Sequence, residues 1–287
     1  MTQIRIITDN AADRATITVA NTAAGMGSDK LKTDIKGEVC RVLASSATIT
    51  LIWPKMETVG AVVIPASNLG PSSTIRVRAY LDEAGTQILA DSGVKWAAPG
   101  TILENWDFSQ ALNVNTLENW DFSQAVNVNA FTGGVAPITA CYLPEQVVCR
   151  RVVIDVTNTD NTFIDMSRII TGGYHAPKYG ASYGASIGVN DLTQNTRTAS
   201  GDIKSDWGPR NSTLQFDLGW IGNIDRERVR QLISRGVGKF LFISLLAEHY
   251  DPVLERDYSI YGKPSQAGSI SFSAFNLHNT TFQIEGF

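Results

Sequence analysis

The sequence has little charge. Of its 287 residues only 18% are Asp, Glu, Lys or Arg, and 24 basic against 28 acidic residues give a formal net charge of −4. A soluble domain usually carries roughly 25% charged residues. A weakly negative chain without clustered Lys and Arg is not expected to bind the phosphate backbone of nucleic acid. At 43% hydrophobic content, the chain is also too apolar to be disordered.

Long apolar runs are missing as well. The N-terminal nine residues lack the apolar core of a secretory signal, and no apolar stretch reaches the roughly 20 residues that span a bilayer. The three cysteines, Cys40, Cys141 and Cys149, form neither a paired framework nor a Cys-x-x-Cys spacing. We therefore expect buried free thiols, no membrane span, and a protein made in a reducing cytoplasm.

Catalytic motifs are scarce. Ser182 and Ser186 each sit in a Gly-x-Ser-x-Gly match, the pattern of a hydrolase nucleophile elbow. That elbow requires a buried strand before the serine and a helix after it, whereas a polar Gly/Ala/Ser-rich segment surrounds both serines here. The histidines are far apart in the sequence and in no ligand spacing. We predict that the protein is not an enzyme and holds no cofactor. The three histidines are His175, His249 and His278.

Metal-binding patterns are weak. Asp155, Asp160 and Asp165 surround an expected hairpin, but their spacing misses the calcium-loop pattern. Asp9, Asn10 and Asp13 offer oxygen ligands for a calcium ion, although these residue types more often form turns. We predict no metal site and favour a turn at residues 9–13, with bound calcium as the open alternative.

Short strands separated by polar turns dominate what is present. Thr74–Leu81 alternates, with Ile75, Val77, Ala79 and Leu81 on one face and Arg76, Arg78 and Tyr80 on the other. Such a pattern with little helix predicts a sandwich or barrel. Further strands are expected at 47–53, 58–64, 147–156, 162–170, 213–218, 240–245, 269–272 and 281–284.

One helix is predicted at Asp225–Arg235, ended by Gly236. Its apolar positions recur at helical spacing, and its other face mixes Arg226 and Arg230 with Glu227. A mixed-charge face of this kind predicts a helix packed on a sheet rather than one that reads DNA.

A tandem repeat lies in the middle of the chain. Residues 103–115 recur as 117–129 with one change, Leu112 to Val126, which indicates a tolerated duplication in an exposed insertion at about 92–137. Each copy offers aromatic and polar side chains that could stack on a sugar or contact a neighbouring subunit. The alternative is a loop whose aromatics fold back on its own scaffold. The candidate contact residues are Trp106, Asp107, Phe108, Trp120, Asp121 and Phe122, with Asn105 and Asn119 as polar partners.

The first half resembles the galactose-binding-like (discoidin-type) jelly roll. A strand pair ending at Trp53, the segment 58–68 and the strand 74–80 are similar to that family in order and spacing. Residues 150–156 and 164–173 fit its closing strand and returning hairpin. The resemblance implies a two-sheet β-sandwich, and it supplies no binding residues.

The second half resembles minor tail and baseplate proteins of tailed bacteriophages. A Gly/Tyr-rich connector at 171–208, then 210–218, a helix, a strand and residues 256–262 carry this resemblance. It implies a structural protein of the virion tail that binds other tail proteins and forms a trimer or ring. Low surface charge suits surfaces that partners bury.

These observations predict a mainly β chain in two domains. Residues 1–178 are expected to form a jelly-roll β-sandwich with the insertion at about 92–137, and residues 179–287 a smaller α+β, mostly β, domain. The predicted function is a structural subunit of a phage tail tip or baseplate, assembled in the bacterial cytoplasm. The alternative is a carbohydrate-binding module that recognises a host surface glycan.

Overall fold

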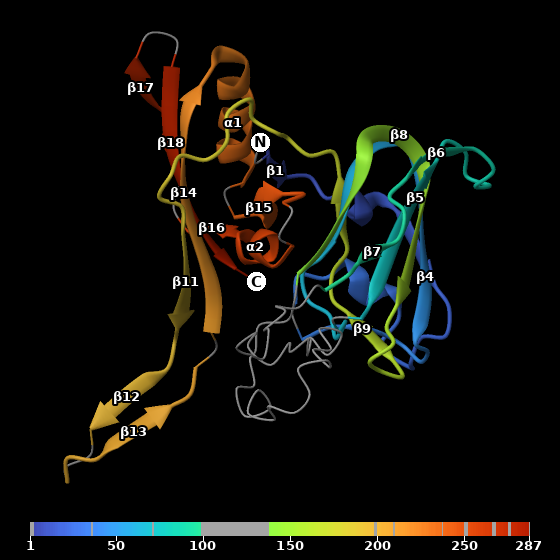
Figure 1. The fold of residues 1–287 in the computed structure, drawn as a ribbon. Coiled ribbons are helices and arrows are strands. Elements are labelled where there is room, and N and C mark those ends of the chain that lie inside the picture. Colours follow the sequence, from blue (N-terminus) through green and yellow to red (C-terminus); the bar gives the residue numbers. More distant parts are fainter. Residues whose placement is uncertain are drawn as a thin grey trace, which may run out of the picture.

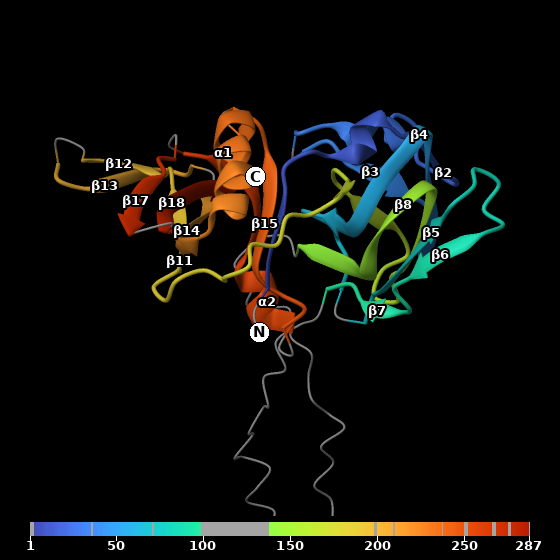
Figure 2. The ribbon, with the colours of Figure 1, turned by 90° about the horizontal axis from the view of Figure 1, so that it is seen from above.

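The computed structural model describes residues 3–35, 37–70, 72–98, 138–197, 200–208, 210–236, 238–249, 252–265, 268–274 and 277–286. Two β-rich units lie side by side in it (Figures 1 and 2). All its strand pairs are antiparallel, and the predicted mainly β class is confirmed. Among these residues, no helix has the length and apolar character needed to cross a membrane.

The N-terminal unit is a curled β-sandwich. Its elements are η1 (Ala11–Arg14), β2 (Thr16–Val19), η2 (Ser28–Lys32), β3 (Cys40–Val42), β4 (Ser46–Ile64), β5 (Thr74–Tyr80), β6 (Ile88–Asp91), β7 (Lys95–Trp96), β8 (Thr139–Thr157), β9 (Ile164–Met166) and β10 (Ile170–Gly172). The main sheet runs β10-β4-β8-β5-β6, with β2 on β4 and β7 on β5. Strands β3 and β9 form a second, two-stranded sheet.

Two long strands shape this unit. The predicted strands 47–53 and 58–64 are one strand, β4, which pairs with β8 from Ser46 opposite Thr157 to Ile64 opposite Thr139. The register shifts twice along this pairing, and bulges of this kind bend and twist a strand. In Figure 1, β8 accordingly curls over the top of the unit.

The core of the N-terminal unit is apolar and fully enclosed. Trp53 is completely buried, and its Nε1 donates a hydrogen bond to the Ala11 carbonyl at 2.7 Å. All three cysteines are buried and free, as predicted. Burial raises the pKa of Cys40 to about 11 and that of Cys149 to about 12, so both thiols are protonated and unreactive at neutral pH.

The C-terminal unit is a sheet covered by a helix. Its elements are β1 (Gln3–Ile7), β11 (Ser186–Asp191), β12 (Gln194–Arg197), β13 (Ile203–Asp206), β14 (Arg210–Ile221), α1 (Asn223–Gly236), β15 (Leu241–Ala247), α2 (Pro252–Asp257), β16 (Ser259–Pro264), β17 (Ser271–Ala274) and β18 (Leu277–Gly286). The sheet runs β1-β15-β16-β18-β14-β11, and β17 also pairs with β18.

The predicted helix at Asp225–Arg235 is confirmed as α1. Its Val229 and Leu232 are buried in one cluster with Leu214, Phe216 and other apolar residues of the sheet. Helix α1 therefore covers one face of the sheet (Figures 1 and 2), while Ile7, Phe242 and Tyr261 on the opposite face pack on the N-terminal unit.

Several sequence expectations need correction. Leu81 was placed on the buried face of its strand, but β5 ends at Tyr80, which is buried while Leu81 is 36% exposed. Strand β7 at 95–96 pairs with β5, and the bounds of the insertion at about 92–137 stay a prediction. The segment 171–208, expected to be a connector, contains β11 and an exposed hairpin, β12–β13. Residues 162–170 form two strands, β9 and β10, rather than one.

The first strand crosses between the units. Strand β1 pairs with β15 in the C-terminal sheet, although the chain then continues into the N-terminal unit. The expected division at residue 178 stays a prediction, and β1 is the part of residues 1–178 that lies in the other sheet.

The two units share a buried contact. Ile7, Phe242 and Tyr261 of the C-terminal sheet pack with Val63 and Ile170 of the N-terminal sheet. Beside them the buried Arg5 guanidinium lies between two tyrosine rings, with Cζ 4.2 Å from the Tyr142 centroid and 4.4 Å from that of Tyr174. Arg5 also forms an ion pair with Glu248. Apolar packing and cation–π contacts therefore hold the units together.

Candidate functional site

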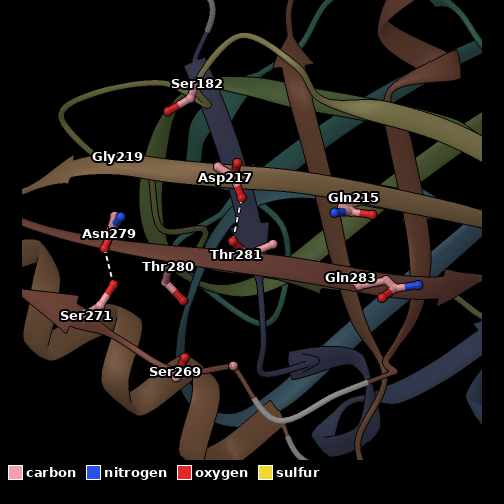
Figure 3. A pocket seen from close by; sticks show the side chains of 11 residues that line it. Ser182, Gln215, Asp217, Gly219, Ser269, Ser271, Asn279, Thr280, Thr281 and Gln283 are labelled. Carbon is pink, nitrogen blue, oxygen red and sulfur yellow. Dashed lines mark hydrogen bonds between the residues drawn. The ribbon is translucent and has the colours of Figure 1, made fainter. Parts of the chain in front are cut away.

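A polar pocket of about 460 Å³ lies on the outer face of the C-terminal sheet, away from α1 (Figure 3). Strands β14 and β18 form its floor, β17 one edge and the segment before β11 another. It is lined by Ser182, Gln215, Asp217, Gly219, Gly268, Ser269, Ser271, Asn279, Thr280, Thr281 and Gln283.

Strand alternation creates this polar floor. In β14 the apolar Leu214, Phe216 and Leu218 are buried toward α1, so Gln215 and Asp217 between them face outward. Strand β18 repeats the pattern. The floor side chains lie directly opposite one another in the register, with Gln215 opposite Gln283 and Asp217 opposite Thr281. Such cross-strand pairs place their Cβ atoms about 4.5–5.5 Å apart, within reach of a single ligand.

A break in the sheet edge forms one wall. Strands β16 and β17 both pair with β18, at residues 284–286 and 277–279 respectively. Gly268 and Ser269, which line the pocket, belong to the segment that connects β16 to β17. Thr280 lies at this wall, and its buried Oγ1 has no hydrogen-bond partner among the described residues.

A loop forms the opposite wall. The Ser182 backbone N donates to the Asp217 carbonyl oxygen at 2.8 Å, which fixes the loop against β14. Gly219 leaves space beside it, because a Cβ at residue 219 would lie 3.0 Å from Ser182 Oγ. The next residue, Trp220, adopts φ 60° at a bulge in the β14–β18 pairing, and its side chain is 65% exposed.

Two hydrogen bonds orient the side chains on the floor. Thr281 Oγ1 donates to Asp217 Oδ1 at 2.6 Å, and Ser271 Oγ donates to Asn279 Oδ1 (Figure 3). The Gln215 and Gln283 amides make no side-chain hydrogen bonds to other described residues. The floor therefore presents ordered acceptors and donors together with two amides that no other described side chain engages.

The side chains of the site are polar and mostly uncharged. Its side chains are hydroxyls, amides and one carboxylate, with no histidine or cysteine among the described lining residues. Ser182 lies in a loop and is followed by a turn, so the strand–serine–helix elbow that its motif requires is not formed, and Ser186 begins strand β11. Across the part of the chain that the structure describes, no cluster of His, Cys, Asp or Glu could hold a metal ion.

The acidic candidates for metal binding have structural partners. Asn10 caps η1, with its Oδ1 accepting from the Ala12 N at 3.1 Å, which confirms a turn at residues 9–13. Asp13 pairs with Arg168 at 2.6 Å. Of the hairpin carboxylates, Asp155 pairs with Arg78, Asp160 accepts from the Ser72 hydroxyl, and Asp165 pairs with Arg41.

The histidines lie on different elements. His175 bridges to β1, with its N donating to the Ile6 carbonyl at 2.8 Å, and burial lowers the pKa of its ring. His278 is buried in β18 beside the Phe272 ring, and His249 follows β15. The structure does not bring them together.

The predicted contact residues of the repeat lie outside the described residues. These are Trp106, Asp107, Phe108, Trp120, Asp121 and Phe122, and their role stays a prediction. The sequence reasoning missed the pocket itself. The signal was present in the alternation of residues 213–218 and 280–284, but the pairing of these strands was not evident from it.

Neither a family model nor a curated protein matches the sequence. Among solved structures, the chain is similar to a Ruminococcus gnavus GH29 fucosidase in complex with fucose, with a TM-score of 0.38, 13% identity, and coverage of 58% of this chain and 27% of that one. It therefore spans about a quarter of that enzyme's length.

Two smaller structures are also similar. One is a chitosan-binding module from a Paenibacillus sp. IK-5 chitosanase/glucanase, with a TM-score of 0.36, 12% identity and coverage of 57% and 99%. The other is the CBM32 of AlyQ in complex with 4,5-unsaturated mannuronic acid, with a TM-score of 0.34, 14% identity and coverage of 57% and 95%. Similarity this distant carries no inference about ligands, and the fold class follows from the strands described above.

Proposed function

We propose that the protein is a non-catalytic carbohydrate-binding protein, and that the pocket on the outer face is its glycan site. The observation that carries the proposal is the lining of the pocket. Amides of Gln215, Asn279 and Gln283 alternate with hydroxyls, so that donors and acceptors are interleaved. Each sugar hydroxyl is both a donor and an acceptor, and an interleaved set of neutral groups suits it.

The scaffold supports this use. Two paired strands present the floor side chains, and a site built on strands holds its geometry better than one built on loops. Two exposed aromatic residues directly follow lining residues in the sequence, Tyr183 after Ser182 and Trp220 after Gly219. Aromatic rings at such positions can add a stacking surface for the apolar face of a sugar.

A glycan array with the purified protein tests the proposal. The double substitution Gln215→Ala plus Gln283→Ala removes two amides from the floor, and we expect at least a tenfold loss of binding. Gln194→Ala is the matched control, since this exposed glutamine lies in the β12–β13 hairpin outside the pocket. No glycan bound by the unchanged protein would refute the proposal.

The same array tests the site predicted from sequence. Trp106→Ala plus Trp120→Ala removes both repeat tryptophans and changes none of the described lining residues of the pocket. If binding is lost in this variant and kept in the glutamine variant, the glycan site lies in the repeat rather than on the outer face.

A structural subunit of a phage tail is the second candidate function. The observation that favours it is the β12–β13 hairpin, which projects from the body of the C-terminal unit (Figure 1). All eight of its strand residues are exposed, and Trp207 just after it is 81% exposed. Exposed hairpins with apolar residues commonly pair with neighbouring subunits.

Sedimentation of the full chain tests this candidate. A defined trimer or ring that dissociates on Ile203→Asp plus Trp207→Ala would support it. A concentration-independent monomer that is absent from assembled particles would contradict it.

A further inference from the structure

The described lining of the pocket contains an acidic residue and no basic residue. Of the described lining residues, Asp217 alone carries a charge. Glu285 lies farther along the same face of β18, opposite Thr213 and opposite Lys263 of β16. Arg210, at the far end of β14, is tied to Asp191 at 3.1 Å. The basic residues of this face are thus placed beside acidic ones, whereas Asp217 forms no ion pair with any basic residue that the structure describes.

Asp217 is held in place. Its backbone carbonyl accepts the Ser182 N–H, and its Oδ1 accepts the Thr281 hydroxyl. Its Oδ2 has no partner among the described residues. A carboxylate fixed at one oxygen and free at the other can accept from a sugar hydroxyl or pair with an ammonium group, but it repels a second carboxylate.

We infer that the outer-face pocket selects its glycan by charge, favouring neutral and amino sugars over sugars that carry a carboxylate, with Asp217 as the selecting residue. The inference rests on the proposed glycan-binding function of the same pocket. It follows from the position of Asp217 among the described lining residues, where it is the one charged side chain and has no basic partner. Like charges brought together at a binding site weaken the wrong complex more than opposite charges strengthen the right one.

The size of the effect follows from exposure. Asp217 is an exposed residue, and pairs between exposed charges contribute little, because water and salt screen them. We therefore expect an amino sugar to bind about three- to fivefold more tightly than its N-acetylated form at low salt. Most of this advantage should disappear at 1 M NaCl, where screening acts over roughly 3 Å.

The substitution Asp217→Asn isolates the charge. The Asn Oδ1 can still accept the Thr281 hydroxyl, so the shape of the floor and its one internal hydrogen bond are kept. Thr213→Asp adds a carboxylate on the same face outside the pocket and controls for net charge.

The experiment uses the full chain and three probe classes: neutral, amino and uronic- or sialic-acid glycans on one array. A glucosamine oligosaccharide and its N-acetylated form are then titrated in solution, at a pH where the amine is protonated. We expect array binding to neutral and amino glycans and little to acidic ones. In Asp217→Asn the preference for the amine should disappear and acidic glycans should gain at least threefold.

The outcomes separate the two proposals. Strong binding of acidic glycans by the unchanged protein, or an amine preference that survives Asp217→Asn, would overturn charge selection while leaving glycan binding intact. A change in Thr213→Asp that is equal in size and opposite in direction to the change in Asp217→Asn would also overturn it, since net charge rather than the pocket would then decide. No binding in any class would overturn the glycan-binding function itself.

Discussion

The outer surfaces of the two units use polar residues differently. On the N-terminal unit, the polar side chains of β5 and its neighbours are paired with one another: Arg76 binds Asp91 at 2.5 Å, and Asp155 binds both Arg78 and the Thr48 hydroxyl. On the C-terminal sheet, the Gln215 and Gln283 amides and one oxygen of Asp217 have no partner among the described residues. On the N-terminal unit, charged side chains of neighbouring strands pair with one another. On the C-terminal sheet, the polar side chains named above remain available to a ligand.

Within the C-terminal sheet the same contrast separates adjacent residues of one strand. Phe216 is 1% exposed and stacks on Phe282 with ring centroids 5.3 Å apart, while Gln215 beside it faces outward. The two faces of β14 therefore have different roles. The buried face stabilises the unit, and the outward face is available for binding.

The largest expected effect is on the buried face. Phe216→Ala should lower the free energy of unfolding by about 3–5 kcal/mol, because it leaves a cavity between α1 and the sheet. Gln215→Ala should change it by less than about 0.5 kcal/mol. Urea denaturation of both variants checks this. Similar losses of unfolding free energy in the two variants would show that the two faces of β14 contribute equally to stability.

An intermediate effect is expected from filling the pocket. Gly219→Ala places a methyl group 3.0 Å from Ser182 Oγ, and we expect glycan affinity to fall about fivefold, with stability changed by less than about 1 kcal/mol. Gly222→Ala is the matched control, since its added methyl group meets nothing within 4 Å. Isothermal titration with the best glycan from the array measures the affinity of both variants, and urea denaturation measures their stability. Unchanged affinity in Gly219→Ala would place the ligand elsewhere.

The smallest expected effect is on the paired surface. The Arg76 guanidinium lowers the pKa of Asp91 below its usual range of about 4. A depressed folded-state pKa contributes stability that is present above the unfolded-state pKa and is lost as the pH falls through the folded-state value. Thermal unfolding from pH 6 to pH 2.5 should show this loss, and Arg76→Gln should reduce it. Glycan binding at pH 7 should be the same in Arg76→Gln and the unchanged protein.

Much of the fold could be predicted, because side-chain patterns within short segments indicate the secondary structure. The alternation in 74–80, the periodicity of Asp225–Arg235 and the buried cysteines are all properties of short segments. The prediction was wrong at 171–208, where the expected connector contains strand β11. Strand β11 pairs with β14 and strand β1 pairs with β15, and the residues of β11 and β1 do not by themselves specify these partners.

The candidate site shows the same limit. Ser182 matches the motif of a hydrolase nucleophile. In the structure, its backbone N–H instead fixes a loop against Asp217 at the pocket. The residues that line the pocket come from four segments between 182 and 283, and each by itself looks like an ordinary polar turn or a strand face.

By itself, the sequence determined the mainly β class, the amphipathic helix and the polar character of every other residue in β14 and β18. These follow from side-chain periodicity and burial, which act over a few neighbouring residues. Only the tertiary structure decided that these two polar faces lie side by side, that β16 and β17 pair with different parts of β18, and that Asp217 is the one charged residue among the described lining of the pocket. Strand register and order depend on packing across the whole sheet, and no single segment encodes them.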